Sequence, residues 1–134
     1  MKPHEVYFDH LGVEPFEKVT KESGISKTFV LCDQISAELC LPVLNEMVNL
    51  REFTLIIIPT GESYKTIETC NIVWEQLTKI NADRKALLIN LGGGVLTDLG
   101  GFAASCYKRG IRFVNIPTTL LAMVDASTGG KTGV

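Results

Sequence analysis

Three consecutive glycines at 92–94 stand between a run of apolar residues and a segment of small residues. The apolar run, 86–91, is typical of a buried strand, and residues 102–107 are small and apolar enough for a packed helix. The first N–H groups of a helix have no partner within it, and the helix dipole favours negative charge there. Glycines also let phosphate oxygens approach the backbone without meeting a Cβ atom. The stretch therefore predicts a phosphate or pyrophosphate site at 92–95, although such a turn can also serve only to change the direction of the chain.

Two common nucleotide motifs are absent. The dinucleotide fingerprint Gly-x-Gly-x-x-Gly would need a glycine where the chain has Thr97. Residues 130–132, Gly-Lys-Thr, match the end of a P-loop, but the P-loop also needs a glycine at Asp125 and a strand directly before it. We therefore exclude a P-loop NTPase and keep Lys131 as a candidate anion ligand and Asp125 as a candidate polar anchor.

The elements that would position these residues alternate along the chain. Apolar runs rich in β-forming residues predict strands at 28–32, 53–58, 86–91 and 111–116. Helices are expected at 36–50, at 66–80 and after the glycines, the last one ending at Lys108-Arg109-Gly110. Ser36 is expected to cap the first of these helices, and Pro42 must lie early in it or break it. A short strand at 6–8 and a helix at 15–22, ended by Ser23-Gly24, are further possibilities.

Strands with continuous rather than alternating apolar residues are buried on both faces, as in a parallel sheet covered by helices. We therefore expect an α/β fold with a Rossmann-like parallel sheet flanked by helices. In such a sheet the carboxyl ends of the strands meet at one edge, where ligands bind. Asp33, 61–65, 92–98 and 118–119 each follow a strand and should converge there.

Each of these residues also has a purely structural interpretation. Asp33 could accept hydrogen bonds from ribose hydroxyls or cap a helix. Glu62 and Lys65 could bind a sugar hydroxyl and a phosphate or, being three residues apart, pair with each other. Asp98 is expected in the first turn of its helix, where the dipole favours a carboxylate in any case. The hydroxyl and N–H groups of 118–119 could bind a ligand or cap a helix.

The composition limits the function classes. The chain has 134 residues, 46% hydrophobic and 21% charged, which is ordinary for one globular domain. The net charge of −2 and the absence of a Lys/Arg run give no case for nucleic acid binding. Neither a secretory signal nor an apolar run long enough to span a membrane is found, so we expect a soluble, cytoplasmic protein.

The metal-ligand residue types are scattered. The two histidines, His4 and His10, lie near the start of the chain without a local acidic cluster, so no metal site is expected from these residues. The four cysteines form no Cys-x-x-Cys pair, and each stands in an apolar segment; we expect reduced, buried thiols at Cys32, Cys40, Cys70 and Cys106.

Four segments carry a pattern that is shared with a known family: 61–65 (Gly-Glu-Ser-Tyr-Lys), 92–98 (Gly-Gly-Gly-Val-Leu-Thr-Asp), 116–122 (Ile-Pro-Thr-Thr-Leu-Leu-Ala) and 124–132, which contains Gly-Gly-Lys-Thr. Together they resemble the 3-dehydroquinate synthase family, the sugar-phosphate cyclases of the shikimate pathway. Each segment alone is weak evidence for the family, but the order and spacing of the four are specific to it. The resemblance covers most of the chain beyond about Lys27.

The resemblance implies an activity. Members of this family hold NAD tightly together with a divalent metal, zinc or cobalt. They convert 3-deoxy-D-arabino-heptulosonate 7-phosphate to 3-dehydroquinate and phosphate. A secondary alcohol is oxidised, phosphate leaves by β-elimination, the ketone is reduced again, and ring opening is followed by an intramolecular aldol closure. NAD is thus regenerated within each turnover.

The resemblance also implies the site residues. Asp125 and Lys131 match positions that line the cofactor and substrate cleft and are the catalytic candidates. The chain departs from the family pattern at Ile35, where asparagine is frequent, at Ala126, where serine is usual, and at Thr128. The cofactor-binding candidates are Asp33, Thr60, Gly61, Glu62, Lys65, Gly93, Gly94, Val95, Leu96, Thr97, Asp98, Thr118, Thr119, Leu121 and Lys131.

The largest departure is length. Family members are much longer and carry their metal ligands, a glutamate and two histidines, in a helical C-terminal domain. Residues 1–134 therefore resemble the N-terminal NAD-binding domain of a two-domain enzyme, commonly a homodimer, and are expected to show no turnover alone. The alternatives are another sugar-phosphate cyclase, a glycerol-dehydrogenase-like oxidoreductase of the same architecture, and a non-catalytic nucleotide-binding module.

Overall fold

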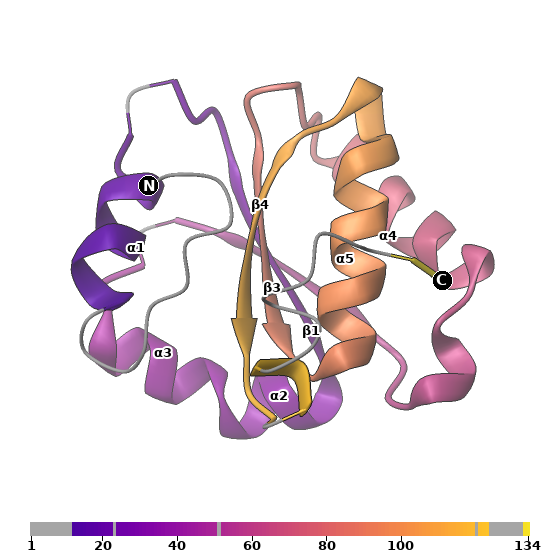
Figure 1. Ribbon diagram of the computed structural model, residues 1–134. Coiled ribbons are helices and arrows are strands. Elements are labelled where there is room, and N and C mark those ends of the chain that lie inside the picture. The colour runs from indigo at the N-terminus through magenta and orange to yellow at the C-terminus, as the bar shows by residue number, and fades with distance from the viewer. Residues whose placement is uncertain (1–11, 23, 51, 120, 124–132) are drawn as a thin grey trace.

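The computed structural model describes residues 12–134 except 23, 51, 120 and 124–132 (Figure 1). Four parallel strands form one sheet in the order β2-β1-β3-β4. The predicted parallel α/β architecture is confirmed, with strand ends that differ by a residue or so from those expected. The strands are β1 (Thr28–Asp33), β2 (Thr54–Ile58), β3 (Leu87–Gly92) and β4 (Arg112–Pro117).

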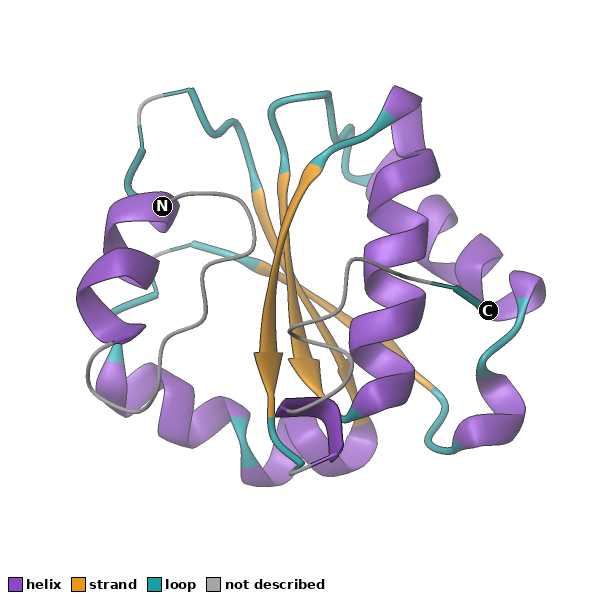
Figure 2. Ribbon diagram, in the orientation of Figure 1, coloured by secondary structure: helices purple, strands orange, loops and turns teal. Residues whose placement is uncertain are grey.

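Helices cover both faces of the sheet (Figure 2). One face is covered by α1 (Val13–Thr20), α2 (Gln34–Leu39) and α3 (Leu41–Met47). The other is covered by α4 (Ile67–Lys79) and α5 (Gly94–Cys106). Two short 3₁₀ turns, η2 (Glu62–Tyr64) and η3 (Tyr107–Arg109), precede α4 and follow α5.

Successive residues of β1 enter different cores, which explains its unbroken apolar sequence. Phe29 and Leu31 pack among residues of α4 and α5, whereas Val30 and Cys32 pack against the α1–α3 side. All four side chains are fully buried. Burial on both faces is the pattern of a parallel sheet between two helical layers.

The prediction of a single helix at 36–50 was wrong, because the helix begins earlier and is divided into α2 and α3. Asp33, and not Ser36, is the N-cap: its carboxylate accepts hydrogen bonds from the Ser36 N–H (2.8 Å) and from the Ser36 hydroxyl (3.0 Å). The helix is interrupted at Cys40, and Pro42 lies in the first turn of α3, where its missing N–H removes no helical hydrogen bond. The break that Pro42 made possible therefore separates α2 from α3.

Helix α5 ends at Cys106, just before the segment Lys108-Arg109-Gly110 at which it was expected to end. Lys108 and Arg109 have left-handed backbone angles, with φ of 46° and 68°, and Gly110 follows with φ of 109°. The Lys108 ammonium donates to the carbonyl of Ala82 (2.8 Å), beyond the end of α4, instead of interacting with the end of α5. The strand expected at 6–8 lies outside the described residues.

None of the four cysteines forms a disulfide, and the expectation that all four are buried is only partly correct. All four thiols are free, with Cys32 and Cys70 buried, Cys40 half-buried and Cys106 exposed. Burial raises the pKa of the Cys32 thiol and of the Cys70 thiol, each to about 11. Cys106 is exposed because it lies in the last turn of α5, beyond the buried stripe of that helix.

These two thiols predict a loss of stability at alkaline pH. Well below pH 9, the ordinary thiol pKa, both thiols are protonated in the folded and the unfolded chain. As the pH rises from 9 towards 11, the unfolded chain releases these protons while the folded chain retains them, so the free energy of unfolding should fall. Urea unfolding at several pH values measures the slope. A Cys32→Val/Cys70→Val variant should show a shallower slope, and an unchanged slope would contradict this assignment.

Candidate functional site

The carboxyl ends of the four strands lie at one edge of the sheet, where the arrowheads point in Figure 1. The loop after β3 contacts the segment after β4: the N–H of Thr118 donates to the carbonyl of Gly92 (2.9 Å). A Cβ atom on Gly93 would lie 3.2 Å from the Thr119 side chain. The expected convergence of the glycine loop with 118–119 is therefore confirmed.

The first turn of α5 offers backbone donors to a ligand. Gly93 is its N-cap and supplies no side chain, so the amides of Gly94, Val95 and Leu96 open the helix without a side-chain cap. The Thr97 N–H is the first to bond within the helix, to the carbonyl of Gly93 (3.1 Å). Among the described residues no side chain caps these three N–H groups, and such groups at the positive end of a 13-residue helix favour an anion.

The three glycines have different structural roles. Gly92 has φ of +156°, and a Cβ atom there would lie 2.0 Å from the Leu96 side chain. Gly92 is therefore required by the fold of the loop. A Cβ atom on Gly94 would have no neighbour within 4 Å among the described residues, so these residues leave open space beside Gly94 at the helix start. Of the three glycines, only Gly94 has space beside its Cα atom that no described side chain fills.

An ion pair joins the loop after β2 to α5. The Lys65 ammonium lies 2.8 Å from Asp98 Oδ2 and 3.8 Å from Glu62 Oε1, and both the Lys65 and Asp98 side chains are about three-quarters buried. The pairing of Glu62 with Lys65 was foreseen from their spacing, but the shorter contact with Asp98 was not. Asp98 lies in the second turn of α5, because the helix begins at Gly94. The expectation that Asp98 lies in the first turn of its helix was therefore wrong.

The remaining candidates differ in what they can offer. Leu96 and Thr97 are buried, so they would contact a ligand through the backbone only. Thr60 and Thr118 are exposed at this edge. Leu121 is 75% exposed. Asp125 and Lys131 lie outside the described residues.

Two of the capping alternatives are confirmed. Asp33 caps α2 through Oδ1, and Thr119 Oγ1 accepts from the N–H of Ala122 (3.2 Å). Neither contact tests a ligand role, which stays a prediction for both residues. Within the described ranges, no group of three His, Cys, Asp or Glu side chains is placed to hold a metal ion. Among the same residues, no helix is long and apolar enough to cross a membrane.

The chain is an α/β domain of the Rossmann-like class, in which a glycine-rich turn leads from a central strand into a helix. The family of the N-terminal part of 3-dehydroquinate synthase matches residues 55–134. The chain belongs to this family.

The relatives agree with that assignment. The chain is 44% identical over 131 residues to 3-dehydroquinate synthase of Campylobacter jejuni, covering 98% of this chain and 35% of the relative. It is 47% identical over 105 residues to the Pseudomonas aeruginosa enzyme, covering 78% and 28%. The chain thus spans about a third of the length of the curated relatives that it matches.

The fold also matches solved sugar-phosphate cyclases. 2-epi-5-epi-valiolone synthase from Streptomyces hygroscopicus, determined with NAD+ and Zn2+ bound, has 38% identity and a TM-score of 0.66 over 81% of this chain and 31% of that one. 2-deoxy-scyllo-inosose synthase has 23% identity and a TM-score of 0.74 over 90% and 35%, which shows a shared fold.

Proposed function

We propose that the chain is the NAD-binding portion of a 3-dehydroquinate synthase that converts 3-deoxy-D-arabino-heptulosonate 7-phosphate to 3-dehydroquinate and phosphate. The observation that carries the proposal is the start of α5, where three uncapped N–H groups meet the open space beside Gly94. The pyrophosphate of NAD needs backbone donors that no Cβ atom blocks. When bound, NAD would accept a hydride from a secondary alcohol of the substrate and later return a hydride to the ketone at the same carbon.

The residues of this chain would hold and orient the cofactor. We assign the pyrophosphate to the amides of Gly94 and Val95, with Gly93 giving close access. Asp98 lies one turn beyond these amides on α5 and pairs with Lys65. Both side chains would contact the ribose or phosphate groups, together with Glu62. The other candidates keep the same proposed role: Asp33, Thr60, Gly61, Leu96, Thr97, Thr118, Thr119, Leu121 and Lys131.

Several parts of the proposal reach beyond the described residues. Asp125 and Lys131 are proposed as catalytic residues facing the sugar phosphate. A divalent metal, zinc or cobalt, would be held by ligands outside these 134 residues. We further propose a homodimer in the cytoplasm for the complete protein. A related cyclase activity is the second candidate, supported by the 38% identity to 2-epi-5-epi-valiolone synthase.

A titration with NAD tests the cofactor site. We expect a Lys65→Gln variant to bind NAD roughly tenfold more weakly, because it loses a cation beside the cofactor and leaves Asp98 unpaired. Lys79→Gln on the outer surface of α4 is the matched control and should bind NAD as the unmodified chain does. Equal NAD affinity in both variants would show that Lys65 does not contribute to the NAD site.

A phosphate-release assay with the heptulosonate phosphate, NAD and zinc tests the reaction separately. We expect release from a form of the protein that includes a metal-binding domain and none from residues 1–134 alone. Release by the 134-residue chain would contradict the division of the site between two domains. NAD binding without phosphate release by the longer form would favour another cyclase or a binding module.

A further inference from the structure

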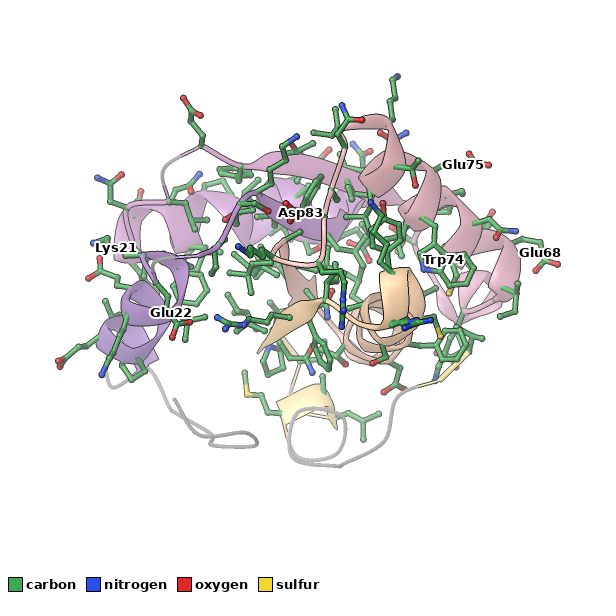
Figure 3. The ribbon with its side chains drawn as sticks, turned by 90° about the horizontal axis from the view of Figure 1, so that it is seen from above. Lys21, Glu22, Glu68, Trp74, Glu75 and Asp83 are labelled. Atoms are coloured by element: carbon green, nitrogen blue, oxygen red, sulfur yellow. The ribbon has the colours of Figure 1, made fainter. Side chains whose placement is uncertain are left out.

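The amino ends of the strands form a second functional candidate, at the opposite end of the molecule from the glycine loop. Figure 3 shows this end from above, with Asp83 near its centre and Lys21 and Glu22 to one side. This end of the molecule carries eight of the chain's 13 lysines and arginines, although the net charge of the whole chain is −2. All eight are exposed, and they come from three separate segments: Lys21, Lys27, Lys79, Arg84, Lys85, Lys108, Arg109 and Arg112. We call this surface the amino-end face.

Direct contacts join the three segments into one surface. The N–H of Ser26 donates to the carbonyl of Lys85 (3.1 Å). The Lys27 and Lys108 ammonium groups donate to the carbonyls of Ile80 and Ala82, at and just beyond the end of α4. The C-terminal end of a helix carries partial negative charge, so it holds both cations in place without neutralising either of them.

The carboxylates on the amino-end face do not balance these cations. Glu22 pairs with Arg112, and Lys21 lies 3.8 Å from Glu17 on α1. Asp83 accepts hydrogen bonds from the Ser26 hydroxyl and from the N–H of Lys85, and these bonds, with the charges of Lys85 and Lys108, lower the pKa of its carboxyl. Four cations form no side-chain hydrogen bond or ion pair with the described residues: Lys79, Arg84, Lys85 and Arg109.

A hollow lies beside the cations. It has a volume of about 760 Å³, and Lys21 and Lys27 form part of its wall. Ile25 and Leu50 give the wall apolar surface, and Glu52 also lines it. A hollow with both apolar and cationic walls can accept an amino-acid side chain while the backbone of a ligand crosses the neighbouring charges.

We propose that the amino-end face binds an acidic peptide segment of a partner protein, with carboxylates over the unpaired cations and one side chain in the hollow. Single-stranded RNA fits the surface less well, because base stacking needs exposed aromatic side chains. Among the described residues of the amino-end face, no aromatic side chain is exposed: Tyr107 is buried, and Phe53 and Trp74 are half-buried. This binding would be independent of the NAD site, which lies at the other edge of the sheet.

Poly-L-glutamate is the probe that tests the proposal, with a uridine oligonucleotide of similar charge for comparison. We expect poly-L-glutamate to bind the purified protein at low salt and to bind less tightly as salt is added. An Arg84→Gln/Lys85→Gln variant should bind roughly tenfold more weakly, as expected for two exposed charge contacts. Asn45→Asp/Asn71→Asp is the matched control, because it changes the net charge by the same amount at exposed positions on α3 and α4.

The expected result is weakened binding in the first variant, normal binding in the control, and NAD affinity unchanged in both. An equal loss in both variants would show that only net charge matters and would overturn the proposed face. Tighter binding of the oligonucleotide than of poly-L-glutamate would show that the amino-end face prefers a nucleic acid, and it would overturn the proposal of an acidic peptide. Absence of binding to either probe would also overturn the proposal.

Discussion

A Gly94→Val variant is expected to fold normally and to bind NAD roughly a hundredfold more weakly or not at all, a loss of about 2.7 kcal/mol or more. The valine side chain would enter the space at the first turn of α5, where a Cβ atom meets no atom of the described residues within 4 Å. It would therefore meet the pyrophosphate and not the protein. Helix propensity favours valine slightly over glycine, so the free energy of unfolding should hardly change.

The matched control lies at the other end of the same helix. Cys106 is exposed in the last turn of α5, so Cys106→Val adds a branched side chain far from the glycine loop. Calorimetric titration should show normal NAD affinity for this control, and circular dichroism should show both variants folded. Normal NAD affinity in Gly94→Val would mean that the start of α5 is not the pyrophosphate site and that the glycines only turn the chain.

Gly92 provides the opposite comparison. Its φ of +156° and the 2.0 Å approach of a Cβ atom to Leu96 predict that Gly92→Val would disturb the loop itself. Loss of NAD binding in that variant would therefore carry no information about ligand contact. The difference between two glycines of one motif separates a residue that the fold requires from a residue that the ligand requires.

Much of the fold could be predicted from the sequence because its signals are local. The runs at 28–32 and 86–91 are apolar without alternation, and the structure buries both faces of β1 and β3. The position of the glycine loop at the carboxyl edge then follows from the parallel order of the strands. Asp33 and Ser36 could each cap a helix, and the choice between them depended on where β1 ends, which composition does not determine.

The contacts that the sequence did not reveal join distant residues. Lys65 and Asp98 are 33 positions apart, and each had an adequate local explanation. The amino-end face was missed because its cations come from three segments, none of which is a basic run. A strand order of β2-β1-β3-β4 places those segments together, and the sequence predicts a parallel sheet without specifying the order of its strands.

Asn90 is a further residue whose role is visible only in three dimensions. It lies inside the apolar run of β3 and is fully buried. Its Nδ2 donates to Asn115 Oδ1 (2.9 Å) on the neighbouring strand β4. Its Oδ1 has no hydrogen-bond partner within the described part of the chain. This oxygen faces Gly100 of α5, where a Cβ atom would lie 2.0 Å away.

We therefore expect Asn90 and Gly100 to be strongly coupled in stability. Gly100→Ala alone should lower the free energy of unfolding by about 1–3 kcal/mol, because the added methyl group overlaps the amide of Asn90. Without that overlap, alanine in a helix would be more stable than glycine by about 1 kcal/mol. Asn90→Ala alone should also destabilise the protein, because it leaves a void and removes the partner of Asn115.

The double variant Asn90→Ala/Gly100→Ala distinguishes this packing from two independent effects. The methyl group at position 100 would enter the space left by the amide, so the double variant should be more stable than the sum of the single changes by about 1–3 kcal/mol. Urea unfolding of the four proteins measures this coupling, provided that the slope with urea concentration stays the same. Additive losses would show that α5 can move away from β3 to admit the methyl group. The close approach of α5 also sets where its first turn lies relative to the strand end. NAD affinity should therefore fall in Gly100→Ala and recover in the double variant.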